Sequence, residues 1–358
     1  MKLFQNSSEG GRRDLSLDFA KAICIILMVI GHSGCPGYLR DFLYLFHMPC
    51  FFFISGYLLN DKYVKDIKMG LRRKLKGIYY PYVKWTVFFL LLNLVSRFFI
   101  MGEICSAREA FAKLVGILTM SHLERLAGGY WFLVSLLIAS VISMLVLYAL
   151  RNVNDKGRYA ALAGTGILIL LFGVSQKYLS VRIPVQFHEP TCMGVAFYIS
   201  GYLFRKANVR TCSSIIMECG LLLIPAVMAL FVHWGADSCK GWQILPYYIV
   251  AICGTMGVIG ISSRLSQIGA FSSVMSYIGK RTLDILTFHF LAFKLVTAVY
   301  VFVCHLPLQD LSAWPVLTGV DDRMWIAYSL FGLAFPLLVR KLLDNTTVLC
   351  KKIWAKCR

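Results

Sequence analysis

Long apolar segments separated by short polar ones run along the whole chain. A helix needs roughly 20 consecutive apolar residues to cross a bilayer. On this basis we expect membrane helices over residues 16–34, 42–60, 79–100, 130–150, 158–175, 191–204, 212–232, 244–262, 282–303 and 324–342. The pattern therefore predicts an all-α integral membrane protein with about ten transmembrane helices.

One segment between these spans has a different pattern. Residues 107–120 carry apolar positions at helical spacing with charged residues between them. Such an amphipathic helix can lie in the plane of the membrane interface with its apolar side in the lipid. We expect this segment to form an interfacial helix within the longest loop on the outer side.

The composition supports the membrane assignment. Of the 358 residues, 58% are hydrophobic and 15% are charged, whereas charged residues make up about a quarter of a typical soluble protein. The formal net charge of +19 does not indicate nucleic-acid binding, because most lysines and arginines fall in alternate loops. Cytoplasmic loops carry such an excess of basic residues. We expect both termini in the cytoplasm and no nucleic-acid partner.

The chain is predicted to contain one folded unit. Residues 1–15 form a cytoplasmic N-terminal segment, 16–342 a transmembrane domain and 343–358 a basic cytoplasmic tail. The tail is expected to form a helix against anionic lipid. The first apolar run has no small-residue cleavage site, so we expect a retained helix rather than a signal peptide.

The cysteines and glycines exclude several kinds of site. The twelve cysteines include no Cys-x-x-Cys pair, and most lie within apolar runs, where cysteine behaves as a small hydrophobic residue. Cys105 and Cys239 fall in predicted outer loops, where a disulfide is an open alternative. We predict no metal site, because no His, Cys and Asp cluster has ligand spacing. No P-loop or Gly-x-Gly-x-x-Gly motif is present, which argues against nucleotide chemistry.

The first apolar segment contains an acid, a base and a histidine. Lys21 and His32 are eleven residues apart, which is about three helical turns and roughly 16 Å, and Asp18 lies one turn before Lys21. The three side chains therefore share one face, and ionisable groups inside a membrane helix normally face the protein interior. His32 is suited to act as a general base at neutral pH. The alternative is a hydrogen-bonded structural histidine at the helix end.

Several motifs resemble the membrane-bound acyltransferase-3 family. The first helix of that family carries a basic residue, ten intervening positions and a catalytic Gly-His, as Lys21 and His32 do here, although many members have arginine at the basic position. Residues 43–57 resemble its Phe-His-Met-Pro helix, and residues 276–289 resemble the entry to a late helix. Residues 128–133 resemble the Trp-Phe-Leu signature of the branch without an appended extracytoplasmic hydrolase-like domain.

The resemblance implies a membrane O-acyltransferase. It would move an acyl group, expected to be acetyl, from cytoplasmic acyl-CoA to a hydroxyl of an exported carbohydrate or glycolipid. Acetyl-CoA is then a substrate, and no tightly bound cofactor is expected. The implied site residues are His32, Asp18, His47 and His289 for catalysis, Lys21, Arg72, Arg73, Lys280 and Arg281 for the donor, and Glu189 and Trp131 for the acceptor.

Other interpretations stay open at this stage. His47 and His289 could be packing residues, the basic residues could only set membrane topology, Trp131 could belong to an interfacial aromatic belt, and Glu189 could be a solvated loop residue. An O-succinyltransferase of the same type is one alternative function. A glycoconjugate transporter or flippase without covalent chemistry is another, because intramembrane ionisable residues fit transport equally well. The expected location is the bacterial inner membrane, in contact with its lipids.

Overall fold

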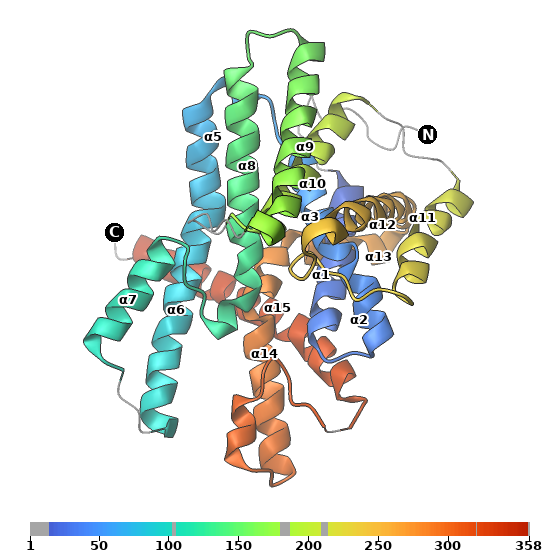
Figure 1. The fold of residues 1–358 in the computed structure, drawn as a ribbon. Helices are drawn as coiled ribbons and strands as arrows, with labels where there is room; N and C mark the ends of the chain where they lie inside the picture. Colours follow the sequence, from blue (N-terminus) through green and yellow to red (C-terminus); the bar gives the residue numbers. More distant parts are fainter. Residues whose placement is uncertain (1–13, 102–104, 180–186, 209–213, 320, 357–358) are drawn as a thin grey trace.

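A computed structural model describes residues 14–101, 105–179, 187–208, 214–319 and 321–356 (Figure 1). Within these residues the secondary structure is helical and contains no strand. The α-helices are α1 (Leu15–His32), α2 (Gly37–Tyr44), α3 (His47–Tyr57), α4 (Lys62–Lys65), α5 (Ile67–Lys74), α6 (Tyr80–Ser96), α7 (Ala107–Leu118), α8 (Trp131–Ala149), α9 (Asp155–Leu179), α10 (Glu189–Lys206), α11 (Ile215–Met228), α12 (Ile244–Leu265), α13 (Gly269–Lys280), α14 (Thr282–Val303) and α15 (Met324–Lys356). Short π or 3-10 segments are η1 (Leu75–Tyr79), η2 (Arg97–Met101), η3 (Arg125–Tyr130), η4 (Gly241–Gln243) and η5 (Leu308–Ser312).

The prediction of an all-helical, multi-pass integral membrane protein is confirmed. Among the described residues, seven helices are long and apolar enough to cross a membrane. The other three predicted spans correspond to α3, α10 and α11. Of these, α3 has 11 residues and α11 has 14, so both are shorter than a full membrane crossing.

The predicted span 42–60 is broken into α2 and α3, so a continuous helix there is wrong. Pro49 lies in the first turn of α3, where its missing backbone N–H is tolerated, but a continuous helix would need that N–H to donate to the carbonyl of Leu45. Phe46 has φ −145°, outside the helical range, and α3 begins one residue later. The break places Tyr44 at the end of α2 and His47 at the start of α3.

Helix α1 ends at His32, two residues before the predicted end. Ser33 donates from both its backbone N–H and its Oγ to the carbonyl of Ile30, which closes the last turn. Gly34 then adopts φ +82°, the left-handed conformation that commonly stops helices and that glycine tolerates. His32 is therefore the last residue of α1, a helix in which 11 of 18 residues are buried.

Helix α1 lies at the centre of the bundle, against α3, α12, α13, α14 and α15. The closest approach is to α13: a Cβ added to Gly279 would lie 1.9 Å from the carbonyl oxygen of Asp18. Arg281 has φ −113° and ψ 18°, which separates α13 from α14, so Lys280 and His289 lie on different helices.

Helices α3 and α10 touch through a reciprocal pair of glycines. A Cβ on Gly56 would lie 1.8 Å from the carbonyl oxygen of Tyr198, and a Cβ on Gly201 would lie 1.9 Å from that of Phe53. Each glycine thus faces the residue three positions before the other glycine. Such close approach through small residues is typical of packing between membrane helices. The same Ile-Ser-Gly-Tyr sequence occurs in both helices, at 54–57 and 199–202.

The predicted amphipathic segment forms α7, which begins after the N-cap Ser106. It is attached to the α5–α6 helix by the hydroxyl of Tyr79, which donates to the carbonyl of Leu118 at 2.8 Å, and by an Arg97–Glu109 ion pair at 3.2 Å. Figure 1 shows α7 beside the end of α6. Its predicted place at the membrane interface stays a prediction.

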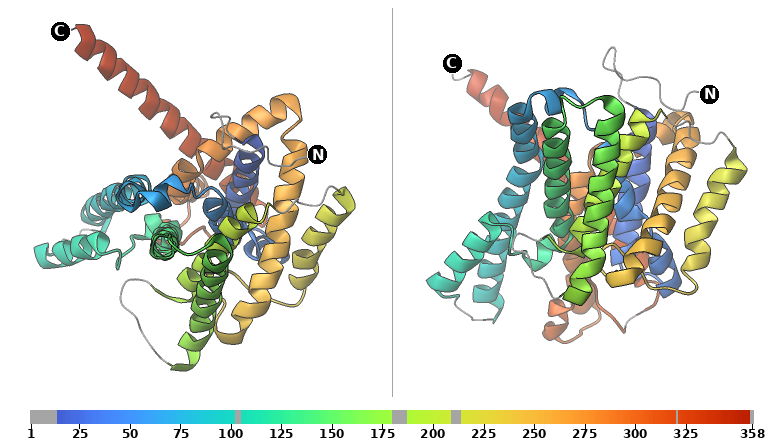
Figure 2. Two further views of the ribbon diagram at one scale, coloured as in Figure 1. Left: turned by 90° about the horizontal axis from the view of Figure 1, so that it is seen from above. Right: turned by 45° about the horizontal axis from the view of Figure 1, so that its top comes forward.

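The predicted basic tail continues α15 as a helix through Lys356. Figure 2 shows the C-terminal part of α15 extending away from the other helices. The start of α1, the α8–α9 connection and this part of α15 lie toward the same end of the bundle (Figure 2, right). The N-terminal segment 1–13 and residues 357–358 lie outside the described residues. Cys105 and Cys239, considered as disulfide partners, are both free thiols.

Candidate functional site

One face of α1 lines two neighbouring cavities. Lys21, Ile25, Met28 and His32 follow one another at steps of four, three and four residues, which places them in one stripe along the helix. The first three line a cavity of about 190 Å³, here called the lysine cavity. Met28 and His32 line a second cavity of about 20 Å³, here called the histidine pocket.

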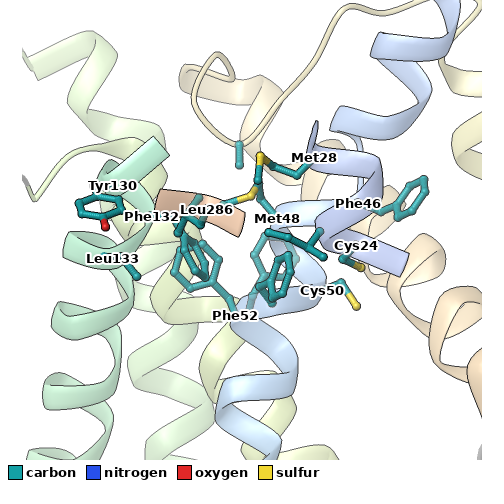
Figure 3. Packing of buried hydrophobic residues seen from close by; sticks show 14 of the residues in the cluster. Cys24, Met28, Phe46, Met48, Cys50, Phe52, Tyr130, Phe132, Leu133 and Leu286 are labelled. Carbon is teal, nitrogen blue, oxygen red and sulfur yellow. The ribbon is translucent and has the colours of Figure 1, made fainter. Parts of the chain in front are cut away.

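Helices α3, α8 and α14 contribute to both cavities. The remaining lining residues of the lysine cavity are Met48, Phe51, Ser55, Gly77, Ile78, Phe132, Leu133, Leu136, Thr282, Leu283 and Leu286. Those of the histidine pocket are Tyr44, His47, Met48, Gly129, Trp131, Ala236, Asp237 and Leu286. Three residues, Met28, Met48 and Leu286, belong to both cavities. Figure 3 shows their side chains converging from three helices.

The lysine cavity has an apolar body and a cationic end. Lys21 pairs with Asp18 at 2.7 Å, and the lysine side chain is 19% exposed whereas the aspartate side chain is 3% exposed. Gly77 lines the cavity and is itself exposed, so the cavity reaches the protein surface beside the π segment η1. The cavity can therefore take an elongated apolar group whose polar end lies near Lys21.

In the histidine pocket the imidazole of His32 is held by Tyr44. The Tyr44 hydroxyl lies 3.0 Å from Nδ1 of His32 and 3.1 Å from the carbonyl oxygen of Gly31. Carbonyls in the last turn of a helix lack intrahelical donors, and a hydroxyl has only one proton. With that proton given to Gly31, Tyr44 accepts from Nδ1–H, which leaves Nε2 of His32 with a free lone pair for a general base.

The glycine of the Gly-His motif makes room for this tyrosine. A Cβ at position 31 would lie 2.5 Å from Cε1 of Tyr44. Contacts this short do not occur in folded proteins, so any larger residue would displace the Tyr44 ring. The absence of a side chain at Gly31 thus allows Tyr44 to lie where its hydroxyl holds His32.

Two further histidines are fixed by backbone carbonyls. Nδ1 of His47 lies 2.7 Å from the carbonyl of Leu43, and Nδ1 of His289 lies 3.0 Å from that of Leu286. Because carbonyl oxygens only accept, each Nδ1 carries the proton and each Nε2 is an acceptor when the ring is neutral. Nε2 of His289 is buried and has no hydrogen-bond partner among the described residues. A buried polar atom without a partner calls for an explanation, and a catalytic role is one of them.

The imidazoles of His32 and His289 stack on one another. Their ring centroids are 5.7 Å apart with planes at 26°, and Phe290 lies 5.2 Å from His32 and 4.0 Å from His289. Gly129 closes this side: a Cβ there would lie 3.0 Å from Leu286 and 3.6 Å from His289. The motifs predicted from residues 128–133 and 276–289 therefore meet at His32.

Asp237 is a pocket residue that the sequence analysis missed. It belongs to the loop between α11 and η4, yet it lines the histidine pocket. Desolvation raises the pKa of its carboxyl above the ordinary aspartate value, against the lowering effect of its own backbone hydrogen bond. A carboxyl in this place can accept hydrogen bonds from hydroxyl groups that enter the pocket.

The structure places some predicted site residues together and others apart. His32, His47 and Trp131 line the histidine pocket, His289 contacts His32, and Lys21 lines the lysine cavity. The other predicted residues line neither cavity. These are Asp18, which pairs with Lys21; Arg73, which lies over the Tyr63 ring; Arg281, which pairs with Asp344 at 3.1 Å; and Arg72, Lys280 and Glu189.

The predicted donor residues nevertheless flank the lysine cavity. Arg73 precedes Gly77 by four residues, about one helical turn, and Arg281 directly precedes Thr282. Gly77 and Thr282 both line the cavity. Basic side chains around a cavity opening raise the local concentration of an anionic ligand without touching its buried part.

Comparison with known proteins agrees with this geometry. A family model described as an acyltransferase domain, that of the acyltransferase-3 family, matches residues 14–339. Nodulation protein NolL of Sinorhizobium fredii is 26% identical over 248 residues, which cover 65% of this chain and 60% of that protein. Nodulation protein NolL of Mesorhizobium japonicum is 26% identical over 243 residues, which cover 63% of this chain and 58% of that protein.

The match therefore spans about 60% of the length of these relatives. No solved structure is significantly similar to the chain. The family model extends over nearly all of the described helices, including α1, α3 and α14, which build the two cavities. The resemblance seen in the sequence is confirmed: the chain belongs to the acyltransferase-3 family and carries its acyltransferase domain.

Proposed function

We propose that this protein is a membrane O-acyltransferase that transfers an acetyl group from acetyl-CoA to a hydroxyl of a carbohydrate or glycolipid. The observation that supports it most is the arrangement of His32, whose Nδ1 is held by Tyr44 beside a pocket that adjoins a larger apolar cavity. A base at the meeting point of two cavities suits a reaction between two substrates that arrive from different sides.

The proposed chemistry is direct transfer. Nε2 of His32 takes the proton of the acceptor hydroxyl as its oxygen attacks the thioester carbon. The C–O bond forms, the C–S bond breaks, and the coenzyme A thiolate takes the proton back from the imidazolium. The tyrosine oxygen accepts from Nδ1–H throughout, and this hydrogen bond strengthens while the ring is charged. General base catalysis of this kind contributes about 10²–10⁴-fold.

The donor would enter through the lysine cavity. The pantetheine arm of coenzyme A would occupy this cavity of about 190 Å³, and its thioester would reach the boundary formed by Met28, Met48 and Leu286. Lys21, positioned by Asp18, would face the polar part of the donor. Arg72, Arg73, Lys280 and Arg281 would attract the phosphates from the cavity surroundings, since arginine forks match phosphate geometry.

The acceptor would approach the histidine pocket from its other side. Trp131 offers an indole face for sugar packing, and Asp237 offers a carboxyl acceptor for hydroxyl groups. A pocket of about 20 Å³ has room for roughly one water-sized group, so a hydroxyl would enter while the rest of the acceptor stays outside. A flippase would need this route to widen enough to pass a whole saccharide.

The proposed location is the bacterial inner membrane with both termini in the cytoplasm. Both NolL relatives come from bacteria. The ends of α1, α9 and α15 that lie toward one end of the bundle are those with the excess of basic residues, as cytoplasmic ends have.

Membranes containing the protein, incubated with radiolabelled acetyl-CoA, test the proposal. Wild-type membranes should transfer label to a carbohydrate fraction, and His32→Ala should lower that transfer by at least about 10²-fold, the lower bound for losing a general base. His188→Ala is the matched control, because His188 is exposed and lines neither cavity.

Two results would overturn the proposal. One is full transfer by a His32→Ala protein that extracts and elutes like the wild type. The other is movement of an unmodified glycan across the membrane with no acyl transfer from any acyl-CoA, which would favour the flippase. Mass spectrometry of surface glycans from cells with and without the protein identifies the acceptor.

A further inference from the structure

Three buried apolar side chains separate the lysine cavity from the histidine pocket. Met28 on α1, Met48 on α3 and Leu286 on α14 are 1%, 7% and 6% exposed, and they are the residues that line both cavities. Figure 3 shows the two methionine sulfurs close together with Leu286 beside them. These residues are called the boundary below. Any group that passes from one cavity to the other meets them.

The space on the two sides of the boundary is very unequal. The lysine cavity measures about 190 Å³ and the histidine pocket about 20 Å³. A cavity needs roughly 10–15 Å³ by this measure to hold a single water molecule. The histidine pocket can therefore hold a hydroxyl group and little else, whereas the lysine cavity can hold a chain of many atoms.

We propose that Met28, Met48 and Leu286 select the donor by the length of its acyl chain. This proposal rests on the proposed acyl transfer. The thioester carbon must come next to the hydroxyl that His32 activates, and the sulfur with its pantetheine arm leads back into the lysine cavity. The acyl chain then occupies the space left at the boundary. A methyl group fits there, and each further methylene collides with the boundary.

The residue types suit this role. Methionine is unbranched and adopts many rotamers, so two methionines can part to admit a thioester and then close around a methyl group. Nearby aromatic rings restrict that movement: Phe51 and Phe132 line the lysine cavity next to the boundary, with ring centroids 5.7 Å apart. The two methionines can thus move only within the limits set by these rings. The space that they leave determines the length of the acyl chain that fits.

The boundary offers no partner for a charged acyl end. Succinyl carries a carboxylate, and burying an unpaired carboxylate among apolar groups is costly. Lys21 also lines the lysine cavity, but it is seven residues from Met28, about 10 Å along α1. The boundary therefore disfavours succinyl-CoA as well as longer apolar donors.

A donor series tests the proposal. Transfer from acetyl-, propionyl-, butyryl- and succinyl-CoA is measured as kcat/KM for full-length protein in membranes. One extra methylene in a filled apolar site typically costs about 10-fold or more, so wild type should prefer acetyl over butyryl by at least about 100-fold. Met48→Ala and Leu286→Val should each reduce that preference at least about 10-fold, and Met48→Phe should abolish use of propionyl-CoA.

Met144→Ala is the matched control, because Met144 is a buried methionine on α8 that lines neither cavity. It should keep the wild-type ratio of acetyl to butyryl transfer. Leu286→Val removes a single methylene, so we expect it to fold. It therefore tests the proposal even if Met48→Ala does not fold. A ratio is used because it does not depend on the amount of folded protein.

The outcomes separate this proposal from the proposed function. Acetyl transfer by wild type with an unchanged donor ratio in Leu286→Val and Met48→Ala overturns the boundary as a selector and leaves the acyltransferase intact. Equal wild-type use of acetyl- and butyryl-CoA does the same. No transfer from any acyl-CoA by wild type overturns both.

Discussion

The hydroxyl of Tyr44 lies 3.0 Å from Nδ1 of His32, and the two residues are joined across the break between α1 and α2. This relationship gives the histidine a defined orientation, which the proposed general base needs because it would take the proton at Nε2. The family resemblance implies roles in catalysis for His47 and His289 as well. In the structure Tyr44 makes the hydrogen bond to His32. His47 packs against Tyr44, with the centroids of the two rings 5.3 Å apart.

Tyr44→Phe should therefore lower kcat while leaving the fold unchanged. The lost hydrogen bond to a ring that becomes charged is worth about 1.5–3 kcal/mol, which corresponds to roughly 10–100-fold in rate. Acetyl transfer by purified protein measures the effect. Tyr38→Phe is the control, since Tyr38 is on the same helix and donates to the carbonyl of Ala226 away from the site. In a His32→Ala background Tyr44→Phe should cost nothing further, and an additive loss there would contradict a role through His32.

Gly31→Ala should mimic the loss of Tyr44. The new Cβ would lie 2.5 Å from the Tyr44 ring, and the ring must move away from Nδ1 of His32 to relieve the contact. We expect a rate loss of about 10–100-fold, as for the tyrosine variant, and little further loss when the two changes are combined. Gly37→Ala serves as control, because no atom lies within 4 Å of its added Cβ. Equal activity of Gly31→Ala and wild type would contradict this account of the Gly-His motif.

The fold was predictable where the apolar runs are long and the local signals agree. Helices α8 and α14 lie within about one residue of their predicted bounds, because uninterrupted apolar segments and polar flanks define both ends. The same reasoning failed for 42–60, where the apolar run continues through Phe46 although the helix does not. Hydropathy is insensitive to backbone geometry, so a break inside an apolar run leaves no hydropathy signal.

The candidate site was predictable only for residues that stand out chemically. His32, His47, His289 and Lys21 are ionisable groups in apolar surroundings, which made them visible in the sequence. Met28, Met48 and Leu286 are apolar among apolar residues, so nothing in the sequence separates boundary residues from the rest of the core. Asp237 is charged and therefore stands out in the sequence. Its place at the site could not be predicted, because tertiary packing decides which loop residues lie there. Gly56 and Gly201 are evident in the sequence, but only the coordinates show that each packs against the helix of the other.

Gly56→Ala and Gly201→Ala should each destabilise the protein. Their added Cβ atoms would lie 1.8 and 1.9 Å from backbone oxygens, which cannot rotate away as side chains do, so α3 and α10 must separate. Overpacking typically costs about 1–3 kcal/mol and more when backbone must shift, so we expect a loss of at least about 3 kcal/mol. Thermal unfolding in detergent measures it. Gly164→Ala on α9 has no atom near its added Cβ and should be neutral or stabilising by up to about 1 kcal/mol.

Asp237→Asn should change acceptor binding and its pH dependence. Desolvation raises the pKa of Asp237, so its carboxylate takes up a proton at a higher pH than the ordinary value of about 3.9. If the carboxylate accepts a hydrogen bond from the acceptor, kcat/KM falls on the acid side as Asp237 is protonated. Asparagine keeps the shape but does not ionise. The variant should raise the KM for acceptor about 10-fold, as expected for one hydrogen bond to a charged group, and should lose that acid limb.

The stability of the same variant has a predictable sign. A carboxyl whose folded-state pKa is raised binds its proton more tightly when folded, so stability falls as pH rises from the unfolded value of about 3.9 through the folded one. At pH 7 the ionised Asp237 therefore costs stability, and Asp237→Asn should unfold at the same or a higher temperature than wild type. Asp322→Asn, in an exposed loop position, should change neither KM nor the pH profile. A destabilised Asp237→Asn protein with an unchanged acid limb would show that the carboxylate supports the loop rather than the acceptor.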